Sequence, residues 1–233
     1  MSIVTSPVTA IIYSFRISWL LWVLGWSAGA LHAQQYSYAG QIGENVYDIS
    51  VHMRTEEGQP VLVLEEKKRY SEHTFDATLG TKKWVLRDTK DQHDFIARRS
   101  GNQIHVQGLF KGESIDKVMD IDERPWFNKL DHGLSNFAAS DQEMLSFWVL
   151  KILSDLDPVK FEAVKGGIET ITVGGHTYDA VKIDLTIDHF ILSKLWSAEL
   201  WYRASDGLFL RYEGVNGRPG TPATIIELEG QVN

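Results

Sequence analysis

The sequence predicts a mainly β (α+β) protein: a curved antiparallel sheet, or half-barrel, with an inserted helix packed in its concave face. Three observations predict this fold. Long stretches alternate between apolar and polar residues, turn residues recur at short intervals, and one apolar stretch in the middle of the chain has helical spacing instead. A period of two places successive side chains on opposite faces of a strand. Nothing resembles the repeated βαβ units of an α/β enzyme.

The chain is expected to begin with a secretory signal peptide over residues 1–33. Its one charged side chain, Arg16, precedes a short apolar run and then small residues, so that cleavage after Ala33 or Ala30 fits. The apolar run is well short of the roughly 20 residues that a membrane-spanning helix needs, which favours cleavage over an uncleaved anchor. Residues 34–233 are then expected to form a single half-barrel domain, periplasmic or secreted, and soluble after cleavage.

Composition excludes several classes of protein. The chain has 233 residues, no cysteine and a formal net charge of −8. Without cysteine there is no disulfide, no thiolate metal site, no cysteine nucleophile and no lipid anchor on a cysteine. The negative charge argues against a nucleic-acid partner, since nucleic-acid binders present a basic surface.

Two segments show the strand pattern clearly. Residues 47–54 and 181–188 each alternate four apolar with four polar side chains, which is typical of antiparallel strands with one wet face. The pairs Gly174-Gly175 and Asp206-Gly207 supply residues that adopt positive φ, as tight hairpins require. Strands separated by such turns predict an antiparallel meander.

The middle of the chain departs from this pattern. Residues 126–139 are expected to form a helix, opened by Pro125, because their apolar side chains recur at three- and four-residue spacing. A strand is expected to follow over residues 145–150. A second helix starting near Ser140 is the alternative, because periodicity alone does not separate a buried helix from a buried strand.

Several of these segments resemble one known family. Residues 125–127 (PWF) and 147–150 (FWVL) are similar to the middle of the domain of unknown function 3108 family. Residues 171–182 (ITVGGHTYDAVK) resemble its central hairpin, and residues 200–212 (LWYRASDGLFLRY) resemble its closing hairpin. The resemblance implies an exported, lipoprotein-carrier-like half-barrel of the bacterial envelope. It implies no activity and no catalytic residue.

Aromatic and aliphatic side chains are the candidate site. The bland interpretation is that they form the core, because aromatic residues bury large areas. The functional interpretation is that part of this set lines a groove for an acyl chain or a hydrophobic peptide. The candidate ligand-binding residues are Trp126, Phe127, Leu130, Leu134, Phe137, Trp148 and Trp201.

Other chemistry has little support in the sequence. The histidines are scattered without the spacing of a zinc motif, so no metal site is expected. No Gly-x-Ser-x-Gly motif and no phosphate-binding loop occurs, and no catalytic residue or cofactor is predicted. The sequence does not decide whether two carboxylates form a pair of the glycosidase type, because the distance between them depends on the three-dimensional structure.

The leading hypothesis is therefore a non-enzymatic envelope protein that binds an apolar or amphiphilic ligand in its cup. The ligand would be a lipid, a lipoprotein acyl chain or a hydrophobic client, with the helix over 126–139 acting as a lid. The alternative is a structural or assembly protein whose own side chains fill the cup and whose sheet edge meets an envelope protein partner. An envelope glycan hydrolase is a weaker alternative. Contact with a membrane is expected only through the signal peptide before cleavage.

Overall fold

The computed structural model describes residues 34–66, 68–152, 155–188, 196–215 and 222–232. The predicted signal peptide over residues 1–33 lies outside the described residues. The chain divides into two units, Met1–Ala30 and Leu31–Asn233, and all described residues belong to the second.

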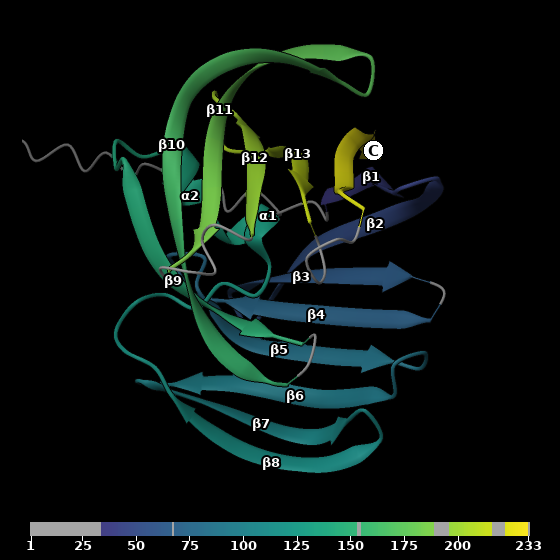
Figure 1. Ribbon diagram of the computed structural model, residues 1–233, viewed down its shortest axis with the longest axis vertical. Coiled ribbons are helices and arrows are strands. Elements are labelled where there is room, and N and C mark those ends of the chain that lie inside the picture. The colour runs from purple at the N-terminus through teal and green to yellow at the C-terminus, as the bar shows by residue number, and fades with distance from the viewer. Residues whose placement is uncertain (1–33, 67, 153–154, 189–195, 216–221, 233) are drawn as a thin grey trace, which may run out of the picture. The chain divides into compact units, whose positions relative to one another are not determined.

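Fourteen strands in the described part of the chain form one sheet, in which every neighbouring pair is antiparallel (Figure 1). Their spatial order is β8-β7-β6-β5-β4-β3-β2-β1-β14-β13-β12-β11-β10-β9, so β8 and β9 are the edge strands. The strands are β1 (Gln34–Ile42), β2 (Asn45–Glu56), β3 (Gln59–Glu66), β4 (Arg69–Phe75), β5 (Thr81–Asp88), β6 (His93–Ser100), β7 (Gln103–Phe110), β8 (Glu113–Asp120), β9 (Met144–Lys151), β10 (Asp157–Val173), β11 (His176–Ile187), β12 (Ser197–Arg203), β13 (Phe209–Gly214) and β14 (Thr224–Val232).

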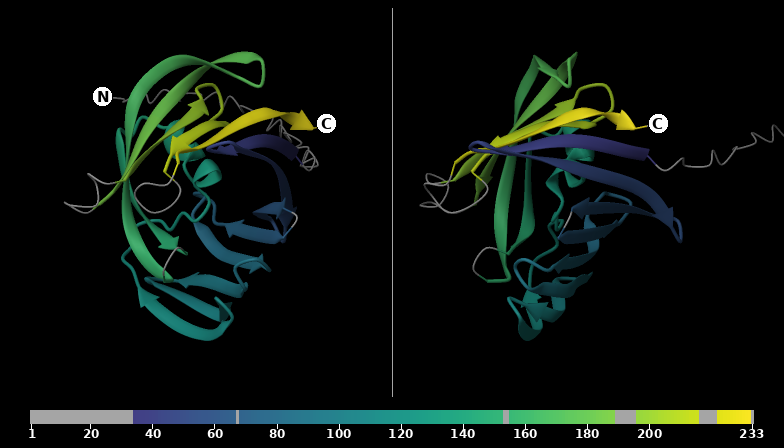
Figure 2. Two further views of the ribbon diagram at one scale, coloured as in Figure 1. Left: turned by 45° about the vertical axis from the view of Figure 1, so that its right-hand side comes forward. Right: turned by 90° about the vertical axis from the view of Figure 1, so that its right-hand side faces the viewer.

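The sheet confirms the predicted half-barrel. It curves around two short helices, α1 (Leu130–Gly133) and α2 (Ser135–Ala138), which lie inside its concave face (Figures 1 and 2). The predicted strands at 47–54 and 181–188 belong to β2 and β11, and both predicted hairpin turns connect adjacent strands. The strand predicted at 145–150 is β9, so the alternative of a second helix from Ser140 is wrong.

The predicted helix over 126–139 is placed correctly but is too long. Only residues 130–133 and 135–138 are helical, and no side chain caps either N-terminus. Residues 126 and 127 are extended because they pair with β9. The Trp148 N–H donates to the Pro125 carbonyl at 2.8 Å, and the Phe127 N–H donates to the Trp148 carbonyl at 2.8 Å. Backbone pairing with a strand has overridden the helical spacing of the side chains.

We call residues Pro125–Asn128 the strap, because they join β9 to β5 across the inside of the sheet. Asn128 is the junction. Its side-chain oxygen accepts the Leu150 N–H at 2.7 Å, while its own backbone N–H donates to the Thr81 hydroxyl at 3.1 Å. The Thr81 N–H in turn donates to the Trp126 carbonyl at 2.7 Å. The strap therefore braces an open sheet from within.

Among the described residues, no backbone ladder joins the edge strands β8 and β9, and side chains span the seam between the two ends of the sheet instead. The Lys117 ammonium of β8 donates to an Asp157 carboxylate oxygen at the start of β10 at 2.5 Å. The Trp148 indole N–H of β9 donates to Asp122, which follows β8, at 2.8 Å. Since no backbone pairing closes the seam in this part of the chain, the sheet is a half-barrel.

The strands have two distinct ends in space. The hairpins β1–β2, β3–β4, β5–β6 and β7–β8 all turn at one end, which we call the open end. At the opposite, closed end, the carbonyl of Ser135 in α2 lies against Gly207 in the β12–β13 turn. Gly207 has a φ of 72°, and a side chain there would collide with that carbonyl. Among the described residues, no helix is both long enough and apolar enough to cross a membrane.

Candidate functional site

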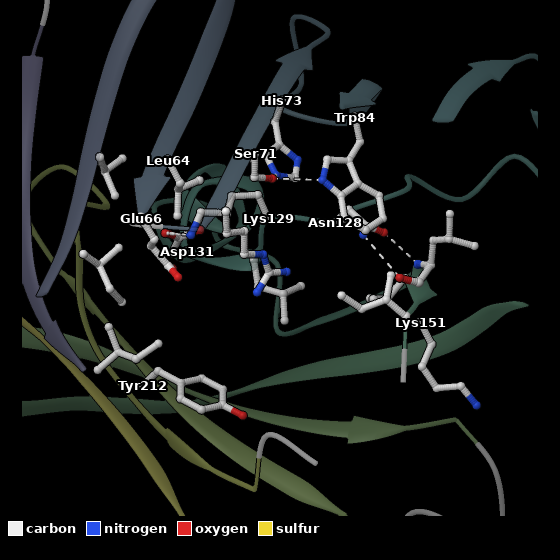
Figure 3. A pocket seen from close by; sticks show the side chains of 18 of the residues that line it. Leu64, Glu66, Ser71, His73, Trp84, Asn128, Lys129, Asp131, Lys151 and Tyr212 are labelled. Atoms are coloured by element: carbon white, nitrogen blue, oxygen red, sulfur yellow. Dashed lines mark hydrogen bonds and ion pairs between the residues drawn. The ribbon is translucent and has the colours of Figure 1, made fainter. Parts of the chain in front are cut away.

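A cavity of about 1030 Å³ lies inside the curved sheet (Figure 3). Its lining includes residues of the strap and α1, and of strands from both halves of the sheet. An apolar cavity of about 150 Å³ is enough to bind benzene, so this one has room for a much larger molecule. The cup is not filled by its own side chains.

One part of the wall is apolar. Strands that are far apart in the sequence each contribute one or two aliphatic or aromatic side chains, which alternation turns toward the concave face. Several of them are buried against the core as well as facing the cavity. The apolar lining includes Ile49, Leu64, Val149, Phe161, Ile187, Trp196, Leu200, Phe209 and Ile226.

The wall formed by β4 and β5 carries a chain of hydrogen bonds. The Trp84 indole N–H donates to the Ser71 hydroxyl at 3.0 Å, and the same hydroxyl lies 2.9 Å from Nε2 of His73 (Figure 3). All three residues are buried and line the cavity. Nδ1 of His73 is also buried and has no hydrogen-bond partner in the described part of the chain. This polar group is set in an aromatic environment, because the imidazole stacks on both Phe75 and Trp84.

Electrostatics keep His73 neutral. Burial, and then the neighbouring Lys129, Arg69 and His132 groups, hold its pKa well below the usual 6.5. Burial likewise lowers the pKa of His132, and Asp131 only partly opposes that effect. A neutral imidazole has one N–H donor and one acceptor nitrogen, so these rings act as hydrogen-bonding groups and not as cations at neutral pH.

An ion pair lies at the inner end of the cavity, where the strap meets α1. The Lys129 ammonium lies 2.7 Å from Oδ2 of Asp131, and the two side chains are only 20% and 15% exposed. The other Asp131 oxygen accepts the His132 N–H at 3.0 Å. Figure 3 shows this pair on the same side of the cavity as Glu66 and Ser71.

The cavity opens at the open end of the strands. Glu66, Asp91 and Lys111 line it there and are exposed, as expected for a mouth in contact with water. Tyr212 lies across from Glu66 and turns its hydroxyl toward the cavity (Figure 3). Burial, with a smaller contribution from Tyr47, raises the pKa of Tyr212 to about 12, so its hydroxyl stays protonated.

Of the seven residues predicted from the sequence, Leu130 lines the cavity and the other six do not. Phe127, Leu134 and Phe137 are buried in the core beneath it, and Trp126 is fully buried in a second core cluster. Leu134 is fully buried and the Tyr202 hydroxyl donates to the Leu130 carbonyl at 2.8 Å, so α1 is held inside the sheet. The expectation that this helix acts as a lid is therefore wrong, because it forms part of the floor.

The two remaining tryptophans, Trp148 and Trp201, contact other side chains of the sheet and not the cavity. Trp148 is half-buried, and Lys160 lies over its ring, 5.1 Å from the centre. Trp201 lies on the face of β12 opposite to the cavity-lining Leu200. There the Lys182 ammonium and the Arg211 guanidinium lie 5.8 and 5.4 Å from its ring centre. Cations over an indole face are favourable contacts, so these rings have structural partners.

Sequence reasoning missed the polar half of the site. Ser71, His73 and Trp84 alternate with other residues on β4 and β5, and Lys129 follows the strap. A weak signal was present, since His73 occupies an inward position of a strand that otherwise buries Ser71 and Phe75. Among the described residues, no group of three or more His, Asp or Glu side chains is placed to hold a metal ion.

Comparison with known proteins supports the fold. No protein-family profile matches the sequence, and no curated protein matches it. A solved structure does: the beta-barrel-like protein of domain of unknown function DUF1849 from Brucella abortus, with a TM-score of 0.54 and 7% identity over 85% of this chain and 96% of that one. The two chains share a fold.

A second structure is less similar. The hypothetical lipoprotein YmcC from Escherichia coli (K12) has a TM-score of 0.39 and 11% identity over 83% of this chain and 86% of that one. The half-barrel rests on the sheet itself and on the DUF1849 structure, while membership of the domain of unknown function 3108 family stays a prediction.

Proposed function

We propose that this protein binds one apolar or amphiphilic molecule, such as a lipid or an acyl chain, inside the half-barrel. The observation that carries the proposal is the large cavity with an apolar wall and an exposed, charged mouth. Burial of apolar surface would drive binding, at about 25 cal/mol per Å² removed from water. Polar groups at the inner end would set the orientation of the ligand.

The cavity also bears on the two alternative functions, a structural protein and a glycan hydrolase. A structural protein with a self-filled cup would use bulky residues such as Trp148 and Trp201 as filler, but neither lines the cavity. A glycan hydrolase would need two carboxylates facing each other across a cleft. The carboxylates that line the cavity are Glu66, Asp91 and Asp131. Glu66 and Asp91 are exposed at the mouth, whereas Asp131 lies at the inner end and is paired with Lys129. A binding role without catalysis fits this arrangement better.

The proposed site of action is the bacterial envelope. The support for it is the signal-peptide pattern over residues 1–33. In this proposal the protein is periplasmic or secreted after cleavage, and its ligand is an envelope lipid, a lipoprotein acyl chain or a hydrophobic client. N-terminal sequencing of the exported protein tests the cleavage directly.

A matched pair of variants tests the binding proposal. Leu64 points into the cavity from β3, so Leu64→Trp should occupy part of it and weaken binding of dodecanoate on the order of tenfold or more (Figure 3). Val118→Trp adds the same ring at a side chain that is 54% exposed on β8, and should leave binding unchanged. Titration calorimetry on both variants, with circular dichroism as a check of folding, gives the comparison. Equal affinities of the two variants would contradict a cavity site.

A further inference from the structure

At the inner end of the cavity, some N–H donors have no hydrogen-bond acceptor among the described residues. An ammonium group has three N–H donors, and that of Lys129 directs one of them to Asp131 at 2.7 Å. Its other two have no acceptor in the described part of the chain, although the side chain is only 20% exposed. Lys129 is half-buried and lines the cavity, so these two donors are available to an acceptor group inside the cavity.

Counting hydrogens at Ser71 adds an independent donor. The indole N–H of Trp84 can only donate, so the Ser71 oxygen accepts it. The Ser71 oxygen and Nε2 of His73 lie 2.9 Å apart, and which of the two donates depends on the imidazole tautomer. In the tautomer with its proton on Nδ1, that N–H group is buried and has no partner among the described residues. In that tautomer the polar wall holds a second unused N–H group.

Most hydrogen-bond acceptors in this region already accept an N–H group of the protein. The Asn128 side-chain oxygen accepts two N–H groups, from Trp126 at 2.6 Å and from Leu150 at 2.7 Å. The two Asp131 oxygens accept the His132 N–H and the Lys129 ammonium. Glu66 also lines the cavity, but it is exposed at the mouth, where water can solvate it.

The electrostatic potential at the polar wall is positive, which agrees with the presence of unused N–H donors. After burial, the two cations that lower the pKa of His73 are Lys129 and Arg69. Asp88 lies 3.8 Å from Arg69 and Asp131 neutralises Lys129, so the balance is modest. A small anionic group at this wall would gain both hydrogen bonds and charge stabilisation.

We propose that the ligand ends in an anionic oxygen group, a carboxylate or a phosphate, which binds the Lys129 ammonium at the inner end of the cavity. The inference rests on the proposed function and names the chemistry of its ligand. The apolar chain of the ligand then lies along Leu64, Val149, Leu200 and Ile226 toward the mouth. Lys129 selects the end group, and the apolar wall provides most of the affinity.

The test compares ligands with one chain and different end groups. Dodecanoate, dodecyl phosphate and dodecanol are titrated into the full chain below the concentrations at which they aggregate. At least one of the two anions should bind on the order of tenfold more tightly than the alcohol, because a hydrogen bond to a charged group is worth that much. The anion that binds more tightly identifies the end group as a carboxylate or a phosphate.

Two variants assign the preference to Lys129. Lys129→Met alone would leave Asp131 buried and unpaired, so the double variant Lys129→Met/Asp131→Asn removes the whole ion pair instead. It should bind dodecanol as the unaltered protein does and lose the preference for anions. Asp131→Asn, which leaves Lys129 without its pair, should increase that preference.

The outcomes separate the two proposals. Equal affinities for the alcohol and both anions in the unaltered protein overturn the anionic end group and leave the proposed function standing. A preference that persists in the double variant overturns the role of Lys129. No binding of any of the three molecules overturns the proposed function and this inference with it.

Discussion

At the scale of single residues, Asn128 connects three parts of the molecule. Its side-chain oxygen accepts the Trp126 indole N–H and the Leu150 N–H, and its side-chain nitrogen donates to the Leu150 carbonyl at 3.2 Å. These partners lie in the strap and in β9, and the backbone of Asn128 reaches Thr81 in β5. A substitution here leaves several buried polar groups without a hydrogen-bond partner.

Replacing Asn128 by alanine should therefore be costly. We expect Asn128→Ala to lower the free energy of unfolding by about 3 kcal/mol, since each buried polar group left unpaired costs about 1–3 kcal/mol. Gln103→Ala is the control, because its bond to Asp120 is exposed. Urea denaturation of both variants measures the difference. A loss at Asn128 no greater than that at Gln103 would show that the strap does not brace the sheet.

Buried histidines make stability depend on pH. The pKa of His73 is well below 6.5 in the folded protein, so between that value and 6.5 the unfolded chain binds more protons than the folded one. Stability should then rise with pH up to about 6.5 and fall as the solution is acidified. His93 and His132, whose pKa values are also lowered by burial, act in the same direction.

The variant His73→Leu isolates one of these contributions. Each proton taken up on unfolding contributes about 1.4 kcal/mol per pH unit to the slope. Between about pH 6 and pH 5, above the range where carboxylates dominate, the slope of unfolding free energy against pH should be smaller in the variant by up to that amount. Because the readout is a slope, a general loss of stability does not affect it. An unchanged slope would mean that His73 is protonated in the folded protein.

At the scale of elements, sequence periodicity located the strands but not their relations. Residues 47–54 and 181–188 could be predicted because one side of each strand is wet and the other buried. The strap could not be predicted, because Trp126 and Phe127 fit the helical stripe and their pairing with β9 is a long-range contact. Local spacing does not reveal such contacts.

The same limit explains the candidate site. Trp201 and its neighbours Leu200 and Tyr202 are all apolar, so alternation does not reveal which of them faces the cup. The aromatic residues near the helix could be predicted as buried, but their number overstated the lining of the cavity. The cavity is instead lined by single side chains from many strands, such as Ile49 and Ile226, which no short motif joins.

Hydrogen exchange tests the strap as an element. The amide protons of Phe127 and Trp148 are donated across it at 2.8 Å, so they should exchange as slowly as those of the β9–β10 ladder. The amide of Thr78, which donates to an exposed Asp76 side chain, serves as the fast reference. Exchange of Phe127 and Trp148 at the Thr78 rate would show that the strap opens independently of the sheet.

At the scale of the whole domain, the half-barrel combines a braced floor with an unfilled interior. The helices and strap occupy the concave face, while the cavity extends from them to the exposed residues of the mouth. Well-packed interiors have few voids larger than a water molecule, so a space of about 1030 Å³ is a departure that the proposed ligand would account for. The central claim is that this space is a binding site.

Tryptophan quenching by a brominated dodecanoate tests this claim most directly. Trp84 and Trp196 line the cavity, whereas Trp126, Trp148 and Trp201 do not. We predict saturable quenching at one ligand per chain, most of which is lost in the double variant Trp84→Phe/Trp196→Phe while native mass spectrometry still detects the bound ligand. Quenching that does not saturate, or that persists unchanged in the double variant, would contradict binding inside the half-barrel.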